Sequence, residues 1–359
     1  MSGTWGRNIR LTIFGESHGP AIGGVLDGLP PGVLLDMEEI AREMARRAPA
    51  GKKLATPRQE KDGVEVQSGV FEGRTTGTPL CFLIPSKDTR SGDYDQLRHC
   101  MRPGHADYAG RVKYGGFQDH RGGGHFSGRL TAPLVFAGAV ARQILAEKGI
   151  RIGAHIRNIG SAADRSFDPM GESPEILETL GRSHWPVLDP AAGERMRVLV
   201  EEVSDAGDSI GGVVECMVTG LPAGLGEPFF DSVESCLAHG LFSIPAVKGV
   251  EFGSGFNLAG MRGSDANDPF RFEEGKVRTE TNHNGGINGG ITNGMPLVFR
   301  AAFKATPSIS LPQKTVDMDA ECDTIIEIKG RHDPCIVPRA VPVVESVAAW
   351  CLLDFLQDR

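Results

Sequence analysis

Three short segments, each with a histidine, carry the side chains best suited to proton transfer. They are residues 15–19 (Gly-Glu-Ser-His-Gly), 102–108 (Arg-Pro-Gly-His-Ala-Asp-Tyr) and 331–334 (Arg-His-Asp-Pro). Histidine exchanges protons near neutral pH more readily than any other side chain. Two of the segments also hold an arginine, which a site for an anionic substrate would need. One such histidine alone would more often be structural, but three segments together with the glycine-rich segment below favour a functional site.

A glycine-rich segment, residues 121–129, has the composition of an anion-binding turn. It reads Arg-Gly-Gly-Gly-His-Phe-Ser-Gly-Arg and directly precedes an apolar stretch expected to be a helix. Glycines that lead into a helix N-terminus expose backbone N–H groups, which favour phosphate or carboxylate. The segment is neither a Walker loop nor a Rossmann turn. Residues 282–290 and 304–308 are two further polar segments that we expect to face a ligand.

Composition and charge limit the classes of protein that the chain could belong to. Its 359 residues are 40% hydrophobic and 23% charged, as in ordinary soluble globular proteins. The formal charge of −8 argues against binding to nucleic acid, which favours a basic surface. Seven cysteines without a Cys-x-x-Cys spacing fit reduced cytosolic thiols and argue against a zinc site. We find no apolar signal region and no apolar run expected to cross a membrane.

Strand-like and helix-like patterns alternate along the chain without a clear linker, which favours one domain over residues 1–359. Strands are predicted from β-branched content or alternation at residues 10–14, 64–71, 80–84, 212–219, 297–303 and 324–328. Helices are predicted at residues 37–47, capped by Asp36, at residues 130–148, apolar on nearly every side, and at residues 343–356, starting after Pro342.

A short likeness between the two halves suggests an internal duplication. Residues 21–25 (Ala-Ile-Gly-Gly-Val) are similar to residues 209–213 (Ser-Ile-Gly-Gly-Val), and residues 28–32 are similar to residues 220–224. A predicted helix follows in each half after a connection of ordinary length. We interpret the pattern as a weak duplication of a strand–turn–helix unit, with chance as the alternative because the match is short.

The histidine segments, together with residues 220–228, resemble the chorismate synthase family, and the likeness covers essentially the whole chain. The resemblance implies an α+β fold, a sandwich of antiparallel β-sheets around a helical layer. It implies the anti 1,4-elimination of phosphate from 5-enolpyruvylshikimate 3-phosphate, giving chorismate, with reduced FMN required but no net redox change. A cytoplasmic homotetramer, NADPH as a possible reductant and an external flavin reductase are further expectations.

The resemblance also assigns roles to residues of this chain by motif. His18 would protonate the departing phosphate, His105 would protonate the reduced flavin, and Asp333 would act in proton removal. Ser17 and Ser127 would support them by hydrogen bonds. FMN contacts are expected at His125, Phe126, Ser127, Pro245, Ala246, Gly289, Lys304, Ala305, Thr306, Pro307, Ser308 and Arg331. Nicotinamide nucleotide or substrate phosphate is expected at Arg47 and Lys53, and substrate anions at Arg46, Arg47, Arg129 and Arg339.

The chain departs from the family pattern at several of these positions. Residues 46–50 read Arg-Arg-Ala-Pro-Ala where Arg-Arg-Arg-Pro-Gly is common. Lys53 stands in place of an arginine, which keeps the charge but loses the bidentate fork. Residues 125–131 read His-Phe-Ser-Gly-Arg-Leu-Thr where Arg-Ser-Ser-Ala-Arg-Glu-Thr is common, and Pro245 replaces an expected asparagine. The side-chain roles at the changed positions are therefore open.

Two other classes of enzyme fit some of the same residues. A flavin oxidoreductase would use bound FMN for net hydride transfer and would oxidise one flavin for each product. A metal-dependent hydrolase would draw its ligands from His18, His105, His332 and Asp333, but the chain lacks a His-x-x-x-His cluster. A non-catalytic binding module would leave the three proton-transfer segments without a purpose.

Overall fold

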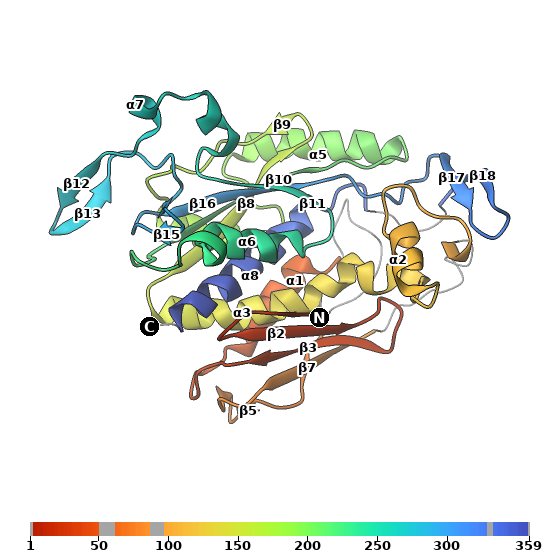
Figure 1. Ribbon diagram of the computed structural model, residues 1–359, viewed down its shortest axis with the longest axis horizontal. Helices are drawn as coiled ribbons and strands as arrows, with labels where there is room; N and C mark the ends of the chain where they lie inside the picture. The colour runs from red at the N-terminus through yellow and green to blue at the C-terminus, as the bar shows by residue number, and fades with distance from the viewer. Residues whose placement is uncertain (1–2, 50–61, 87–96, 329–332, 358–359) are drawn as a thin grey trace.

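A computed structural model describes residues 3–49, 62–86, 97–328 and 333–357 (Figure 1). Within these ranges, two five-stranded sheets with antiparallel pairings form the framework. The first has the order β1-β2-β3-β7-β4, with β1 (Thr4–Trp5), β2 (Arg10–Gly15), β3 (Ala21–Asp27), β4 (Glu65–Val66) and β7 (Leu80–Pro85). The second has the order β11-β16-β10-β8-β9, with β8 (Arg151–Ile159), β9 (Ala162–Ala163), β10 (Gly212–Thr219), β11 (Val247–Phe252) and β16 (Leu297–Phe303).

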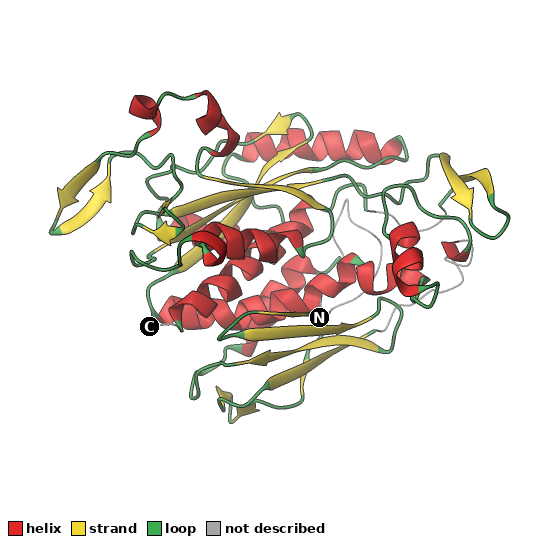
Figure 2. Ribbon diagram, viewed as in Figure 1, coloured by secondary structure: helices red, strands yellow, loops and turns green. Residues whose placement is uncertain are grey.

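A layer of helices lies between the two sheets, as the colouring by secondary structure makes plain (Figure 2). Its members are α1 (Met37–Arg47), α3 (Thr131–Glu147), α6 (Val233–Phe242) and α8 (Val337–Leu356). Two more helices, α4 (Pro174–Arg182) and α5 (Pro190–Asp205), lie on the other side of the second sheet. The architecture is mixed α+β, as the family resemblance implies.

Helices α3 and α8 approach each other closely because α3 carries a glycine at the contact. A Cβ at Gly138 would lie only 2.1 Å from the Cβ of Ser346 on α8. The surrounding core is one apolar cluster that includes Phe82 of the first sheet, Phe136 of α3 and Trp350 of α8. Residues 121–147 are long and apolar enough to span a membrane, yet 78% of their most apolar window is buried inside the protein. We therefore regard α3 as a core helix.

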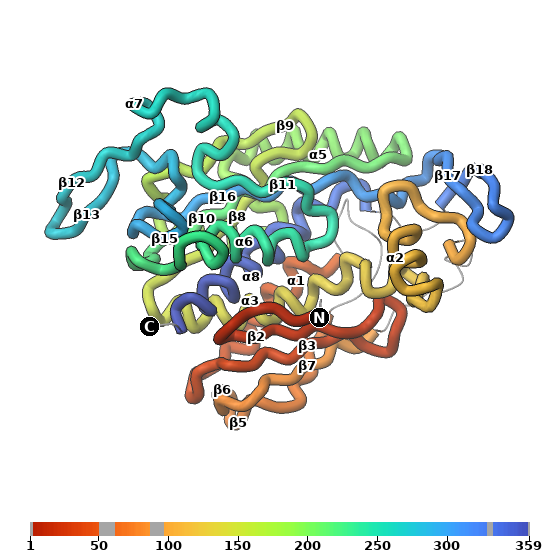
Figure 3. Tube along the Cα trace, in the orientation of Figure 1, coloured from red at the N-terminus to blue at the C-terminus, as the bar shows by residue number. Residues whose placement is uncertain are grey.

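Smaller elements extend from this body. The hairpin β12 (Phe270–Glu273) and β13 (Lys276–Thr279) forms an arm at one end, followed by β14 (Ile287–Asn288) and β15 (Ile291–Thr292) (Figure 3). At the other end lie α2 (Asp107–Tyr114) and the hairpin β17 (Gln313–Asp317) and β18 (Cys322–Ile326). Other short elements are β5 (Val70–Phe71), β6 (Arg74–Thr75) and α7 (Gly263–Ala266). Short 3-10 helices lie at Arg121–Phe126, Gly128–Leu130, Phe229–Asp231 and Gly255–Gly260.

Most predicted elements are confirmed, and the exceptions have local causes. Helix α1 has the predicted bounds, and Asp36 accepts hydrogen bonds from the backbone N–H groups of residues 38 and 39. The single strand predicted at residues 64–71 is wrong, because Gly69 takes a left-handed turn (φ 83°) between β4 and β5. The last helix begins at Val337 rather than after Pro342, which lies inside its second turn. The final predicted strand lies two residues earlier, as β18.

Candidate active site

A cavity of about 690 Å³ gathers segments that are far apart in the sequence. Its wall comes from the end of α1, residues 102–106, the glycine-rich segment, the turn between α6 and β11, the segment after β16 and the start of α8. The predicted site residues in its lining are Arg47, His105, His125, Phe126, Ser127, Arg129, Pro245, Ala246, Lys304, Thr306, Pro307, Ser308, Asp333 and Arg339.

The three consecutive glycines of the glycine-rich segment lie between the two histidines expected to transfer protons. All three have positive φ, with values of 60°, 82° and 53° at Gly122, Gly123 and Gly124. A Cβ on Gly122 would come within 2.6 Å of His18 Nε2 and 2.9 Å of Ser17 Oγ. A Cβ on Gly123 would come within 3.3 Å of His105 Nε2. Only glycine therefore fits at these positions. The glycine turn thus brings the imidazoles of His18 and His105 to the same piece of backbone.

The turn is fastened to the end of β2 and to the loop between β2 and β3 that carries His18. The backbone N–H of Ser17 donates to the carbonyl of Gly124 at 3.1 Å. His125 Nδ1 lies 2.8 Å from the carbonyl oxygen of Gly15, at the end of β2. Phe126, in contrast, places its ring near that of Tyr114 on α2, with centroids 6.2 Å apart. His125 and Phe126, two of the side chains that depart from the family pattern, therefore anchor the turn to its surroundings.

His105 belongs to a compact charged trio that sequence reasoning missed. Its Nδ1 lies 2.6 Å from Asp107 Oδ1, and Arg102 donates from Nε and Nη2 to the same carboxylate at 2.7 and 2.8 Å. Burial alone would raise the pKa of Asp107, but the hydrogen bonds from Arg102 and His105 hold that pKa far below its usual range. The carboxylate is therefore ionised at neutral pH.

Two cavity arginines share a buried carboxylate that the sequence did not indicate. Asp62 Oδ1 accepts from Arg129 Nη1 at 2.9 Å, and Asp62 Oδ2 lies 3.2 Å from Arg47 Nε. Arg47 also donates to the carbonyl of Arg129 at 3.1 Å. Arg339 donates to the carbonyl of Arg47 at 2.9 Å and to Asp333 Oδ2 at 2.6 Å. Three guanidinium groups are thus concentrated at one side of the cavity, as an anionic substrate requires.

The segment after β16 forms another part of the wall. Lys304 donates from Nζ to the carbonyl of Gly104, and Ser308 Oγ accepts from Arg102 Nη1 at 3.2 Å. Burial and the nearby Lys248 both lower the pKa of Lys304. Thr306 Oγ1 donates to the carbonyl of Asp333 at 2.9 Å. The hydroxyls and the ammonium predicted for phosphate binding therefore lie beside both the His105 trio and Asp333.

Some predicted site residues lie elsewhere or outside the described ranges. The described part of the cavity wall includes neither Ser17 nor His18, which are buried against its lining residue Gly122. It also includes neither Ala305 nor Gly289, which lies in the turn between β14 and β15. Arg46 also lies away from the wall, where it binds Glu43 and Glu345 at 2.7 and 2.5 Å within the helical layer. Lys53, Arg331 and His332 fall outside the described residues.

The comparisons with known proteins agree with one another. A family model for chorismate synthase matches residues 9–357. The chorismate synthase of Dehalococcoides mccartyi is 47% identical over 99% of this chain and 96% of its own length, and that of Aeropyrum pernix is 50% identical over 98% and 92%. The chain belongs to the chorismate synthase family. A crystal structure of chorismate synthase, 31% identical, superposes with a TM-score of 0.78 over 99% of this chain and 93% of that one.

Membership of the chorismate synthase family gives the chain its activity. It is a lyase of aromatic amino acid biosynthesis, which converts 5-enolpyruvylshikimate 3-phosphate to chorismate and phosphate. The family requires reduced FMN. Among the described residues, no group of three or more His, Cys, Asp or Glu side chains is arranged to hold a metal ion, so these residues give the hydrolase alternative no support.

The cavity suits the reduced FMN that the chorismate synthase family needs. Among the described residues, the buried Oγ atom of Ser17 has no hydrogen-bond partner, and it lies 2.9 Å from the position of a Cβ on Gly122, which lines the wall. Ala246, in the wall, has a positive φ of 74°, a strained backbone that concentrates at ligand sites. Lys304, Thr306 and Ser308 supply the donors that a phosphate tail requires.

Proposed function

We propose that this cavity is the active site of the elimination, with substrate and reduced FMN bound together in it. The observation that carries the proposal is the glycine turn, residues 122–124, which holds His18 and His105 at adjacent positions. The two imidazoles come from segments more than eighty residues apart in the sequence. A shared turn that only glycine can form has no evident use unless both rings act on the same ligands.

In this proposal the chain's own side chains handle charge and protons. Arg47, Arg129 and Arg339 bind the anionic groups of the substrate and lower the cost of phosphate departure. His18 gives a proton to the departing phosphate. Asp333, fixed by Arg339 at 2.6 Å, takes part in removing the ring proton. Ser17 and Ser127 support these groups by hydrogen bonds.

Reduced FMN, when bound, supplies the electron density that eases the loss of phosphate. We propose that it is held by Ser127, by the backbone at Pro245 and Ala246, and by the segment from Lys304 to Ser308. His105 presents its Nε2 to the same space and holds a proton there. Arg331 and Gly289 stay expected contacts, as do Lys53 and Arg47 for a nucleotide.

We also propose a homotetramer, supported by the apolar arm of β12 and β13. Phe270 and Phe272 on this arm are 67% and 83% exposed, which is costly for large aromatic side chains unless another copy covers them. The cysteine content supports a cytoplasmic location. We also propose that an external reductase reduces the FMN, with NADPH as a possible electron source.

We further propose that the chain is a single sandwich-like domain with two related halves. The similar segments, residues 21–25 and 209–213, contribute to β3 and β10 or directly precede them. Each of these strands is the middle strand of its own five-stranded sheet. The equivalent positions support a duplication of one strand–turn–helix unit.

The test is an anaerobic assay of the purified chain with reduced FMN and 5-enolpyruvylshikimate 3-phosphate. We expect chorismate and phosphate to form in equal amounts. Oxidised FMN in place of reduced FMN is the matched control and should give no product. Failure to form chorismate with reduced FMN, in protein shown to be folded and to bind the flavin, would contradict the proposal.

A further inference from the structure

The trio of Arg102, His105 and Asp107 contains a carboxylate for which the site described above gives no role. We propose that Asp107 is a positioning residue, which fixes the proton of His105 on Nδ1 so that Nε2 faces the cavity as the exchanging atom. The inference rests on the proposed function of His105 and deepens it. Asp107 acts through His105, not on the ligands themselves.

Both carboxylate oxygens of Asp107 contact the other two residues of the trio. Oδ1 lies 2.6 Å from His105 Nδ1 and accepts from Arg102 Nη2 at 2.8 Å. Oδ2 accepts from the Nε and the backbone N–H of Arg102 at 2.7 and 3.1 Å. The side chains of Arg102 and Asp107 are only 5% and 9% exposed, so water competes little for these bonds. The carboxylate therefore has one orientation.

The distances determine which nitrogen of His105 carries the fixed proton. His105 Nδ1 has two polar neighbours, Asp107 Oδ1 at 2.6 Å and Arg102 Nη2 at 3.0 Å. Arg102 Nη2 makes its shorter contact, 2.8 Å, with Asp107 Oδ1, so the guanidinium donates to the carboxylate. An unprotonated Nδ1 would turn its lone pair towards an ionised carboxylate 2.6 Å away, which is repulsive. Asp107 does not supply the proton, because Arg102 and His105 hold its pKa far below the usual range. Nδ1 therefore donates to Oδ1, and Nε2 is the nitrogen left to gain or lose a proton.

The edge of the His105 ring away from Asp107 lies against the glycine turn. A Cβ on Gly123 would approach both Nε2 and Cε1 of His105 to 3.3 Å, and His105 itself lines the main cavity. Asp107 is the first residue of α2, where the helix dipole also favours a negative charge. Arg102 also donates from Nη1 to Ser308 Oγ at 3.2 Å. The guanidinium that binds Asp107 therefore also contacts the segment expected to bind phosphate.

A matched control exists on the surface of the same region. Asp319 likewise lies against a histidine and an arginine, with Nη2 of Arg111 donating to it at 2.9 Å and His99 Nδ1 beside its other oxygen. The side chain of Asp319 is 49% exposed. The variant Asp319→Asn therefore removes the same kind of carboxylate from the same kind of trio without touching the cavity.

The first experiment reads the tautomer of His105 by ¹⁵N NMR of the histidine rings in the enzyme without flavin or substrate. We expect the wild-type protein and Asp107→Glu to hold the proton on Nδ1, and Asp107→Asn to shift the population towards the Nε2 form. Asp319→Asn should leave the His105 signals unchanged. An identical tautomer ratio in the wild type and Asp107→Asn would overturn the proposal.

The second experiment is a double-mutant cycle on turnover with reduced FMN. Asp107→Asn should lower kcat roughly 10- to 100-fold, the loss found when carboxylates that orient metal-bound histidines are changed. In a His105→Ala background the same substitution should change kcat less than about twofold, because its target is gone. An equal loss in both backgrounds would show a merely structural role and sink the positioning proposal. Normal turnover of His105→Ala itself would instead sink the proposed role of His105.

Discussion

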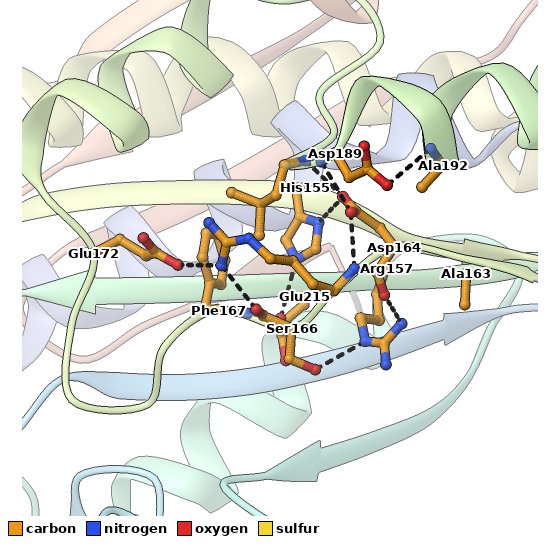
Figure 4. A network of polar contacts seen from close by, with 12 residues as sticks. His155, Arg157, Ala163, Asp164, Ser166, Phe167, Glu172, Asp189, Ala192 and Glu215 are labelled. Carbon is orange, nitrogen blue, oxygen red and sulfur yellow. Dashed lines mark hydrogen bonds and ion pairs between the residues drawn. The ribbon is translucent and has the colours of Figure 1, made fainter.

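His105 and His155 are both held by buried carboxylates, but their surroundings differ. In the trio, His105 gives only Nδ1 to Asp107. In the second sheet, His155 of β8 has both nitrogens occupied, with Nδ1 3.2 Å from Asp164 and Nε2 2.9 Å from Glu215 (Figure 4). The His155 side chain is fully buried, whereas that of His105 is 15% exposed.

The surroundings of His155 are those of a structural clasp. Asp164 accepts from the backbone N–H groups of Leu188 and Asp189 at 2.6 and 3.0 Å, and Glu215 accepts from that of Phe167 at 2.8 Å. The imidazole therefore joins β8 and β10 to the segment that precedes α5. Burial lowers the pKa of His155, but hydrogen bonds and charge from Asp164 and Glu215 outweigh it and raise the pKa overall.

A carboxylate partner alone therefore does not distinguish a histidine proposed to transfer protons from a structural one. Both rings have one, and both carboxylates are themselves well hydrogen-bonded. The difference is a ring nitrogen that is left facing a cavity, which His105 has and His155 lacks. Substitutions at the two positions should accordingly affect different properties.

The largest effect is expected at the histidines beside the glycine turn. His18→Ala and His105→Ala should each lower turnover roughly 10²- to 10⁴-fold, the usual contribution of a general acid or base. Thermal stability should change little relative to the loss of rate. Steady-state assays with reduced FMN measure the first quantity and calorimetry the second. Near-normal turnover in both variants would remove the proton-transfer roles.

A smaller loss of rate should follow from crowding the turn itself. Gly122→Ala adds a methyl group within 2.6 Å of His18 Nε2, and displacement of a reacting group by about 1 Å costs roughly 10²-fold in rate. Gly116→Ala is the matched control. It has the same kind of left-handed backbone, with φ 83°, but nothing within 4 Å of its Cβ position. Equal turnover of the two variants would show that the closeness of His18 is unimportant.

Substitution of His155 should lower the stability of the protein and leave the rate of turnover unchanged. His155→Ala leaves Asp164 and Glu215 facing each other without the shared donor, and removing one partner of a buried charged group costs about 3–5 kcal/mol. Denaturant unfolding measures the loss. The folded fraction of the variant should turn over at the wild-type rate. A stable variant with low turnover would mean that His155 belongs to the active site.

The pH dependence of stability should separate the two histidine environments further. Because the pKa of His155 is raised, its contribution to the free energy of unfolding is complete below the unfolded-state value of about 6.5. It declines as the pH rises through the raised pKa of the folded state. The stability difference between the wild type and His155→Asn should therefore be largest near pH 6 and narrow above it. A difference that widens with rising pH would contradict this assignment.

The sequence predicted the motifs better than the partners of their side chains. Arg46 and Arg47 are adjacent and were given the same role, but neighbours on a helix point about 100° apart. Arg47 therefore reaches the cavity, whereas Arg46 reaches Glu345 in the helical layer. No local signal could link Asp62 to arginines at positions 47 and 129. A local signal did exist for Asp107, because it follows His105 by two residues within the segment 102–108.

Helices and strands could likewise be predicted only where their own residues carry the pattern. The bounds of α1 follow from its periodicity and its Asp36 cap, and α3 follows from an apolar surface on all sides. Helix α2 was missed because its eight residues carry little apolar pattern and depend on Phe126 packing against Gly110. Elements that fold by their own pattern are predictable, whereas those that depend on distant contacts are not.

The central claim is that this cavity performs an elimination in which the flavin is needed but not consumed. The most direct measurement is the number of chorismate molecules formed from a single equivalent of reduced FMN, without oxygen or further reductant, while the flavin spectrum is followed. We predict many turnovers, with the flavin still reduced at the end. One chorismate or fewer per flavin, with matching flavin oxidation, would contradict the account and favour an oxidoreductase.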